Sequence, residues 1–295
     1  MDTKEILKKV RRIEIKTSKI VNTVFSGEYH SSFKGRGMEF DEVRQYYRGD
    51  DVRTIDWNVT ARMNAPYVKR YREERELTSI VLFDASASNE FGTTNLMKGE
   101  IAAEISALIS FSAIKNNDKV GLIIFTDKIE KYVPPKKGRD HVLRVIREIL
   151  YFKTEHKNTD IGIALDFLNK VITRKGVVFL ISDMISPNFQ NPLKIASEKH
   201  DLTAIKITDP KEITLPDVGM VEFEDAESGE YYLVDTSHAN FRKEYQRVNE
   251  LEDTELEKFF KRFNVDYVNL KVDRNYFDDL VVFFKRKAKR KRRGG

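Results

Sequence analysis

Four short apolar runs constrain the fold of this chain more than any other feature. They are IVLF from Ile80, VGLIIF from Val120, VVFLIS from Val177 and LTAIKI from Leu202. Continuous apolar runs of this length are typical of strands that are buried on both faces of a parallel sheet. Segments with helical periodicity lie between the runs. The alternation predicts an α/β domain with a doubly wound, mainly parallel sheet and helices on both faces.

The remaining segments predict three parts. Residues 1–78 hold a helix over about the first 25 residues and then an irregular lobe rich in glycine, charge and aromatic side chains. Residues 79–284 form the α/β domain, with an inserted β-hairpin at about 216–236 and a long helix from Asn240 to Phe263. Residues 285–295 form a basic tail.

Composition excludes several classes of protein. Hydrophobic residues make up 40% and charged residues 34%, which is typical of a folded soluble protein. No apolar stretch reaches 18 residues, so no transmembrane helix is predicted. The charged N-terminus lacks the apolar segment of a secretory signal. The chain has no cysteine, which excludes disulfides and thiolate zinc sites and is compatible with the cytoplasm.

The basic character of the chain is concentrated at one end. The segment KRKAKRKRR from Lys285 to Arg293 carries eight of the basic residues, so the rest of the chain is slightly acidic, at about −3 against a total of +5. Such a tail can bind nucleic acid or an anionic membrane, or simply act as a solubilising end. It has no aromatic residue, which argues against stacking on bases.

Two acidic residues follow buried strands directly: Asp84 after SIVLF and Asp183 after VVFLIS. The carboxyl ends of parallel strands meet at one edge of a sheet, where ligands bind in such folds. Two carboxylates at one edge repel each other unless a positive charge lies between them. A divalent cation is the predicted counter-charge.

Hydroxyl groups extend this candidate site. Ser86 and Ser88 alternate with alanines after Asp84, and Thr159 opens a later helix. An all-oxygen set favours Mg²⁺, with Mn²⁺ or Ca²⁺ as alternatives, and leaves a position for water or a partner's carboxylate. The alternative is that Asp84 and the serines only cap a helix. Asp160 is predicted to cap, and Asp209 to lie in a turn.

The pattern DxSxS, a downstream threonine and a strand-ending aspartate resembles the metal-ion-dependent adhesion site (MIDAS) of von Willebrand factor A-type domains, over roughly 79–284. The resemblance implies that Asp84, Ser86, Ser88, Thr159 and Asp183 hold a metal ion whose open position takes an acidic side chain of a protein partner. It also implies binding and not catalysis.

Acidic and basic residues alternate in the irregular lobe, with a tryptophan among them. Since arginines interleave with the aspartates, we expect a buried ion-pair network rather than a metal site, with a partner-docking surface as the alternative. The residues concerned are Arg48, Asp50, Asp51, Arg53, Asp56, Trp57 and Arg62.

The segments GRGMEF from Gly35 and RQYYRGDDVRTIDW from Arg44, followed by Ala61-Arg62, VKRY from Val68 and Glu74-Arg75, closely resemble the signature of domain of unknown function family 58. That bacterial family joins such a segment to a von Willebrand A-like domain, and its genes often neighbour those of MoxR-type AAA+ ATPases. The resemblance implies a cytoplasmic, metal-dependent adaptor that assists such an ATPase in protein assembly or remodelling.

Two other functions stay open. A metal on the carboxylates could activate water for phosphoester hydrolysis, although no histidine base, GxSxG or GxxxxGK[ST] motif supports this. The basic tail could tether the protein to nucleic acid or to the inner face of the membrane.

Overall fold

The computed structural model describes residues 3–33, 38–73, 76–86, 98–154, 156–224, 230–273 and 275–293. The chain forms two compact units by its internal contacts. The larger unit comprises residues 1–33 and 77–295, and the smaller unit comprises residues 34–76. None of the described helices is both long and apolar enough to cross a membrane.

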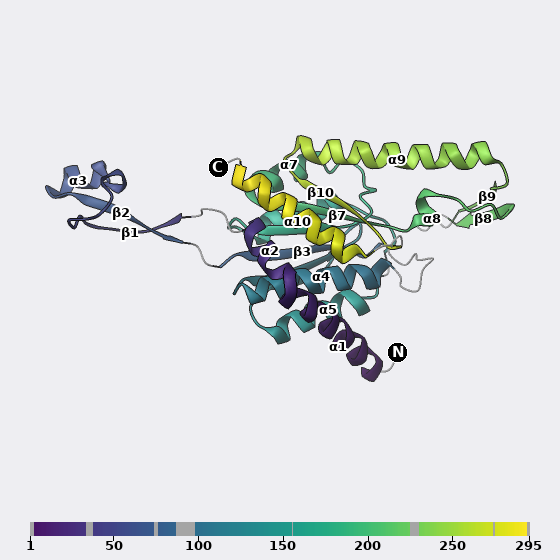
Figure 1. The fold of residues 1–295 in the computed structure, drawn as a ribbon, viewed down its shortest axis with the longest axis horizontal. Helices are drawn as coiled ribbons and strands as arrows, with labels where there is room; N and C mark the ends of the chain where they lie inside the picture. The colour runs from purple at the N-terminus through teal and green to yellow at the C-terminus, as the bar shows by residue number, and fades with distance from the viewer. Residues whose placement is uncertain are drawn as a thin grey trace. The chain divides into compact units, whose positions relative to one another are not determined.

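A six-stranded sheet forms the centre of the larger unit (Figure 1). Its strands lie in the order β10-β7-β6-β3-β4-β5. Five strands are parallel and β5 is an antiparallel edge strand. The strands are β3 (Thr78–Asp84), β4 (Lys119–Phe125), β5 (Ile129–Lys136), β6 (Val177–Ile181), β7 (Asp201–Thr208) and β10 (Asp266–Lys271). The predicted doubly wound, mainly parallel sheet is confirmed.

Both faces of the sheet are covered, and the side chains of β3 show how. Val81 and Phe83 belong to one apolar cluster, whereas Ile80 and Leu82 belong to another. Successive strand residues point to opposite faces, so a strand that is apolar at every position needs helices on both sides. The helices are α4 (Lys98–Lys115), α5 (Arg139–Tyr151) and α10 (Tyr276–Arg293) on one face, and α6 (Ile161–Val171), α7 (Gln190–Lys199) and α9 (Ala239–Arg262) on the other.

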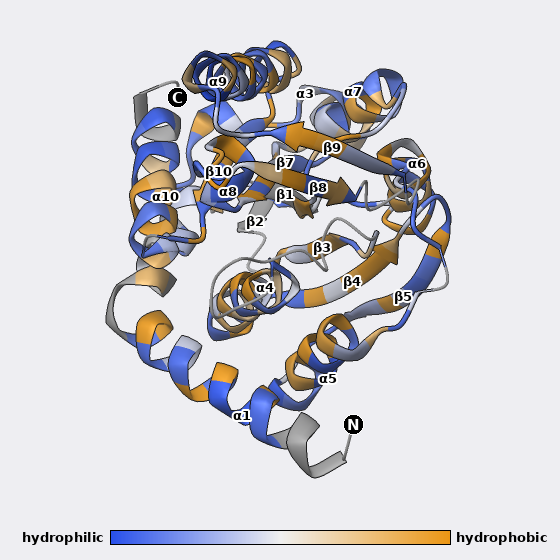
Figure 2. Ribbon diagram, turned by 90° about the vertical axis from the view of Figure 1, so that its right-hand side faces the viewer, coloured by the Kyte–Doolittle hydropathy of each residue, from blue (hydrophilic) through white to orange (hydrophobic). Residues whose placement is uncertain are grey.

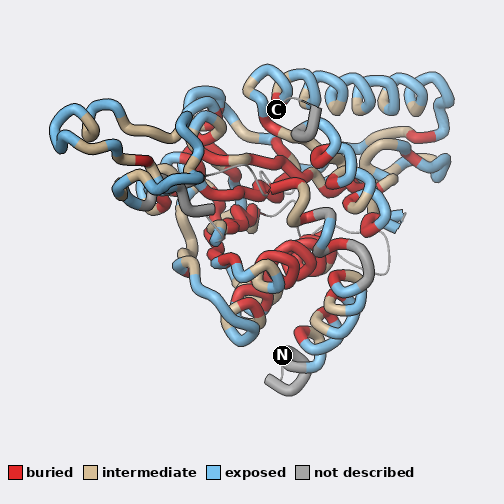
Figure 3. Tube along the Cα trace, turned by 60° about the vertical axis from the view of Figure 1, so that its left-hand side comes forward, coloured by how far each residue is buried: buried red, intermediate tan, exposed pale blue. Residues whose placement is uncertain are grey.

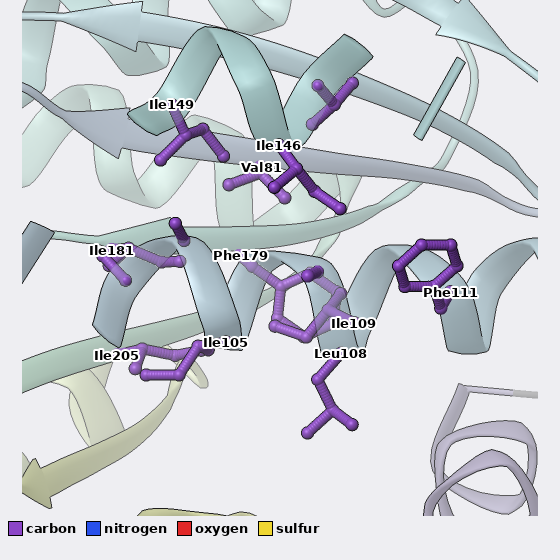
Figure 4. Packing of buried hydrophobic residues seen from close by; sticks show 14 of the residues in the cluster. Val81, Ile105, Leu108, Ile109, Phe111, Ile146, Ile149, Phe179, Ile181 and Ile205 are labelled. Carbon is purple, nitrogen blue, oxygen red and sulfur yellow. The ribbon is translucent and has the colours of Figure 1, made fainter. Parts of the chain in front are cut away.

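Helix α4 is buried on nearly all sides (Figure 3). Its residues Ile105, Leu108 and Ile109 pack in the cluster that also contains Phe179 and Ile205 of the sheet (Figure 4). A helix that is apolar all round must be covered all round. Its outer side is covered by α1 (Thr3–Ile20), a π-helical turn (Val21–Phe25) and α2 (Ser26–Phe33). Figure 2 shows α1, with alternating hydrophilic and hydrophobic residues, beside α4.

This packing differs from the predicted division at residue 78. The N-terminal helices belong to the α/β unit because Val10, Ile13, Phe25 and Tyr29 join its core, where Phe25 and Phe284 meet edge to face at 5.0 Å. Only the segment 34–76 is separate.

The C-terminal segment also differs from the predicted tail. Helix α10 continues to Arg293, and Lys287 is buried, with its Nζ 2.6 Å from Asp201 Oδ1 and 2.8 Å from Asp266 Oδ2. Arg290 also pairs with Asp266. Part of the basic run therefore serves to fasten α10 to β7 and β10.

A short helix, α8 (Pro210–Ile213), follows β7. The predicted hairpin is confirmed as antiparallel β8 (Met220–Glu224) and β9 (Tyr231–Asp235). The long helix expected from Asn240 to Phe263 is α9.

The smaller unit contains β1 (Met38–Gln45), a 3-10 turn (Val52–Thr54), α3 (Trp57–Met63) and β2 (Tyr67–Glu73). β1 and β2 pair antiparallel, which the sequence pattern did not predict. A register shift between Phe40 and Glu42 breaks the two-residue alternation that would have marked the strand.

The N-terminal helices generate the first prediction. Phe25→Ala should lower the free energy of unfolding by about 3–5 kcal/mol, because it leaves a cavity between the π-helical turn and α10. Urea denaturation followed by circular dichroism measures this change. Ile15→Ala, on the exposed side of α1, is the control and should change the free energy by less than about 0.5 kcal/mol. Equal effects of the two substitutions would contradict the packing of this segment on the core.

Candidate metal site at the carboxyl edge of the sheet

Asp84 ends β3, the strand that lies between β4 and β6, and is fully buried. Its Oδ1 accepts a hydrogen bond from the Ser86 backbone N–H at 3.0 Å, and the Ser86 side chain also bonds to the carboxylate. Its Oδ2 accepts a hydrogen bond from Ser182 Oγ at 2.6 Å. These bonds hold the carboxylate in one orientation at the end of the strand.

Asp183 lies beside Asp84 because β3 and β6 pair in parallel with Phe83 opposite Ile181. The side chain of Ser182 connects the two acids, since its Oγ is also 3.5 Å from Asp183 Oδ1. Asp183 Oδ1 accepts a hydrogen bond from the Ile185 N–H at 3.0 Å. The turn is tight enough that Met184 adopts a positive φ of 68°.

Burial, together with the smaller effect of the neighbouring charge of Asp183, raises the pKa of Asp84 to about 6. The hydrogen bonds from Ser182 and Ser86 act in the opposite direction but do not outweigh these two effects. The two acids therefore form a site whose ionised state is favoured by a cation.

Thr159 belongs to a loop that is tied to both neighbouring strand ends. The backbone N–H of Asp160 donates to the Thr126 carbonyl, just after β4, at 2.9 Å. The N–H of Ile161 donates to Ser186 Oγ, just after Asp183, at 3.0 Å. Thr159 itself is buried. The structure thus brings the loops of Asp84, Thr159 and Asp183 to one edge of the sheet.

The other predicted residues have the following places. Ser86 is buried at the site, whereas Ser88 lies outside the described residues. Asp160 caps α6 by accepting from the Ile163 N–H at 3.0 Å, as predicted. Asp209 caps α8, as expected for a turn residue. The sequence analysis did not include Ser182 in the site. The signal that could have identified it is its position, as a polar residue between the buried strand and Asp183.

The donor set fits a hard divalent cation through oxygen alone. Within the described parts of the chain, no three histidine, aspartate or glutamate side chains converge on one point. A cation at Asp84 and Asp183 would therefore depend on the hydroxyl groups of Ser86 and Thr159, on water and on an outside ligand.

Among its described residues, the smaller unit shows no buried ion-pair network of the kind that its sequence suggested. Asp50 pairs with Arg44, at 2.7 Å between Oδ1 and the guanidinium, and the pair is partly exposed. Hydrogen bonds from Arg44 and the Tyr47 N–H lower the pKa of Asp50. Asp51 caps the 3-10 turn and Asp56 caps α3.

The arginines and the tryptophan of this unit are on its surface. Arg48, Arg53 and Arg62 are exposed, and Trp57 is 70% exposed. Asp51 and Asp56 are used locally as caps, and in the described part of the unit Arg48, Arg53 and Arg62 form no ion pair with them. The docking alternative stays a prediction.

A mainly parallel α/β sheet with a two-carboxylate edge is the class that the fold and the site define, and it agrees with the von Willebrand factor A-like architecture expected above. The chain belongs to the family described as "Protein of unknown function DUF58", whose profile matches residues 42–255. That match includes both most of the smaller unit and most of the sheet.

Relatives and solved structures were compared with the chain. The uncharacterized protein Rv1480 of Mycobacterium tuberculosis is 30% identical over 288 residues, which cover 96% of this chain and 90% of the relative. The crystal structure of BatB from Bacteroides thetaiotaomicron has a TM-score of 0.45 at 15% identity and covers 72% of this chain and 99% of that chain. The SpRpn10 VWA domain has a TM-score of 0.41 at 11% identity and covers 70% and 93%.

Replacing Asp84 with asparagine tests the electrostatics of the site. The pKa of Asp84 is higher in the folded protein than its usual value of 3.8, so the fold favours the protonated carboxyl group. Its contribution to stability is therefore fully present below pH 3.8 and is lost as the pH rises through about 6, where the buried group must ionise. In metal-free protein at pH 7.5, Asp84→Asn should therefore raise the free energy of unfolding by on the order of 2 kcal/mol, and the gain should shrink toward pH 4. Urea denaturation in EDTA at both pH values measures it.

Asp166→Asn on the exposed side of α6 is the control and should change stability at neither pH. An equal gain for Asp84→Asn at both pH values would show that packing, and not charge, is responsible.

Trp57 is the only tryptophan of the chain, so its fluorescence reports on the smaller unit. We expect an emission maximum close to that of tryptophan in water and ready quenching by acrylamide in the folded protein, because the side chain is largely exposed. A blue-shifted emission that is protected from acrylamide would restore the buried role expected from the sequence.

Proposed function

We propose that this protein is a metal-dependent protein-binding adaptor. In this proposal Asp84, Ser86, Ser88, Thr159 and Asp183 hold Mg²⁺, or alternatively Mn²⁺ or Ca²⁺, at the carboxyl edge of the sheet. The observation that carries the proposal is the pairing of Asp84 with Asp183 through the shared hydroxyl of Ser182.

The geometry supports a resident cation for a simple reason. A buried and a half-buried carboxylate share this edge, and the donors seen among the described residues include a serine hydroxyl and backbone N–H groups. Neutral donors orient the carboxylates but do not cancel their charge. A divalent cation would cancel it, and the carboxylate and hydroxyl oxygens are ligands that Mg²⁺ prefers.

The proposed role of the site is recognition. Two carboxylates and three hydroxyls leave at least one position of an octahedral ion for an outside ligand. An acidic side chain of a protein partner is a suitable ligand, since a carboxylate oxygen is a ligand that Mg²⁺ prefers and can fill the open position. The bound cation supplies Lewis acidity, while Ser182 and the Ile185 N–H keep the two carboxylates in position.

A MoxR-type AAA+ ATPase is the partner that we propose, in the assembly or remodelling of other proteins. The support for this partner is membership of the family together with the resemblance stated above. The hydrolase alternative has less support, because no histidine and no third acidic side chain joins the two acids among the described residues.

Titration of metal and partner tests the proposal directly. Mg²⁺ should raise the melting temperature of the wild-type protein but not that of Asp84→Ala or Asp183→Ala. The purified MoxR-type ATPase of the same bacterium should bind the wild-type protein in Mg²⁺, and binding should fall by at least tenfold in EDTA and in either variant. Calorimetry and fluorescence anisotropy are suitable measurements.

Asp166→Ala is the matched control for removal of a carboxylate and should retain both responses. Binding of the ATPase that persists undiminished in EDTA would reject the metal-mediated contact. A Mg²⁺ response without ATPase binding would retain the metal site and reject this partner.

A further inference from the structure

The outward side of α1 presents a basic stripe, which we define as Lys8, Arg11, Arg12 and Ile15. Each member lies three or four residues from two others of the set, so the four residues share one face of the helix. Ile15 is 64% exposed among these cations. The opposite face of α1 carries Val10, which is buried on the core, so the helix is amphipathic with its polar side outward.

A groove of about 500 Å³ continues the stripe between α1 and α5. Val10 and Leu143 contribute its apolar lining. Four guanidinium groups surround it, from Arg11, Arg139, Arg144 and Arg147, against the two acids Glu14 and Asp140.

The ion pairs of this region divide the cations into two sets. Lys9 pairs with Glu100, and Lys16 pairs with Glu104 at 2.5 Å, so these lysines fasten α1 to α4. Arg139 pairs with Glu14 at 2.5 Å and fastens α1 to α5. In the described part of the chain, Lys8, Arg11, Arg12 and Arg147 have no carboxylate within ion-pair distance. The second set contributes no ion pair to the fold and is available to an outside anion.

We propose that the basic stripe and the adjoining groove dock the protein on an anionic phospholipid surface. Guanidinium groups match phosphate oxygens with paired hydrogen bonds. The long stems of lysine and arginine cover apolar surface while their charges reach the headgroups, and Ile15 adds an apolar contact between them. A row of charges along a helix that lies flat on its domain suits a planar array of headgroups.

Two other polyanions fit less well. The stripe has no aromatic side chain for stacking on bases, which disfavours single-stranded nucleic acid. A DNA duplex would also have to accept the exposed Ile15 among its phosphate contacts, whereas a lipid surface offers that side chain an apolar contact. The basic end of α10 is a weaker candidate for the same surface, because Lys287 and Arg290 are paired with Asp201 and Asp266.

Co-sedimentation of the full chain with vesicles tests the inference. The protein should bind vesicles that contain phosphatidylserine and not vesicles of phosphatidylcholine alone, and added salt should release it. Each cation near such a surface contributes about fivefold to the partition coefficient, so Arg11→Glu with Arg12→Glu should reduce binding by on the order of 25-fold or more.

The matched control is Lys261→Glu with Arg262→Glu, an adjacent exposed pair at the end of α9 that makes the same change of net charge. Circular dichroism confirms that both double variants are folded. Retention of binding by the control supports a local surface. Equal loss in both variants would overturn it in favour of net charge alone.

Two further arms separate this inference from its competitors. Lys285→Glu with Lys289→Glu on α10 should reduce binding less than the α1 variant, and the reverse order would overturn the assignment to α1. Binding to a duplex oligonucleotide without binding to anionic vesicles would also overturn it. All arms are run in EDTA, so their failure would leave the metal-dependent adaptor unaffected.

Discussion

The parallel pairing of β3 with β6 is the interaction on which the rest of this structure depends. It aligns Phe83 with Ile181, and that single register brings Asp84 and the Ser182-Asp183 pair to the same edge. The same strands are apolar at every position, so they demand a helical layer on each face. Strand pairing therefore determines both the layered core and the meeting of two like charges at one edge of the sheet.

Most of the α/β domain could be predicted because its signal is local. Runs such as VVFLIS identify buried strands without knowledge of their neighbours. The smaller unit was harder, since a register shift in β1 removes the alternation expected of a strand and charged residues occupy much of β2. The place of the N-terminal helices was missed for a different reason. These helices pack where they do because α4 is largely apolar on the side that faces away from the sheet as well. That side needs a cover, and this need is seen only when α4 is placed on the sheet.

The acidic residues of the candidate site could be predicted from the sequence, but the contact between them could not. Terminal acids on buried strands indicated Asp84 and Asp183, but their connection through Ser182 depends on register, which one sequence does not reveal. The lobe shows the opposite error. Asp51 and Asp56 were expected to pair with arginines because the charges alternate, whereas both cap local backbone N–H groups and Asp56 also pairs with Lys69 at 3.4 Å. Capping a local backbone N–H group does not require a second long side chain to be ordered, so it costs less conformational entropy than an ion pair with a distant arginine.

Two surfaces of the larger unit differ in the kind of ligand that their chemistry selects. At the sheet edge, two carboxylates lie together, so the recognition proposed there would depend on a cation and would respond to chelation. On α1, the excess charge is positive, exposed and carried on flexible stems, so recognition there depends on many weak contacts and responds to salt. Because α4 packs against both β3 and α1, one rigid core positions both surfaces. The two proposed ligands, a protein partner and an anionic surface, would therefore not compete for the same groups.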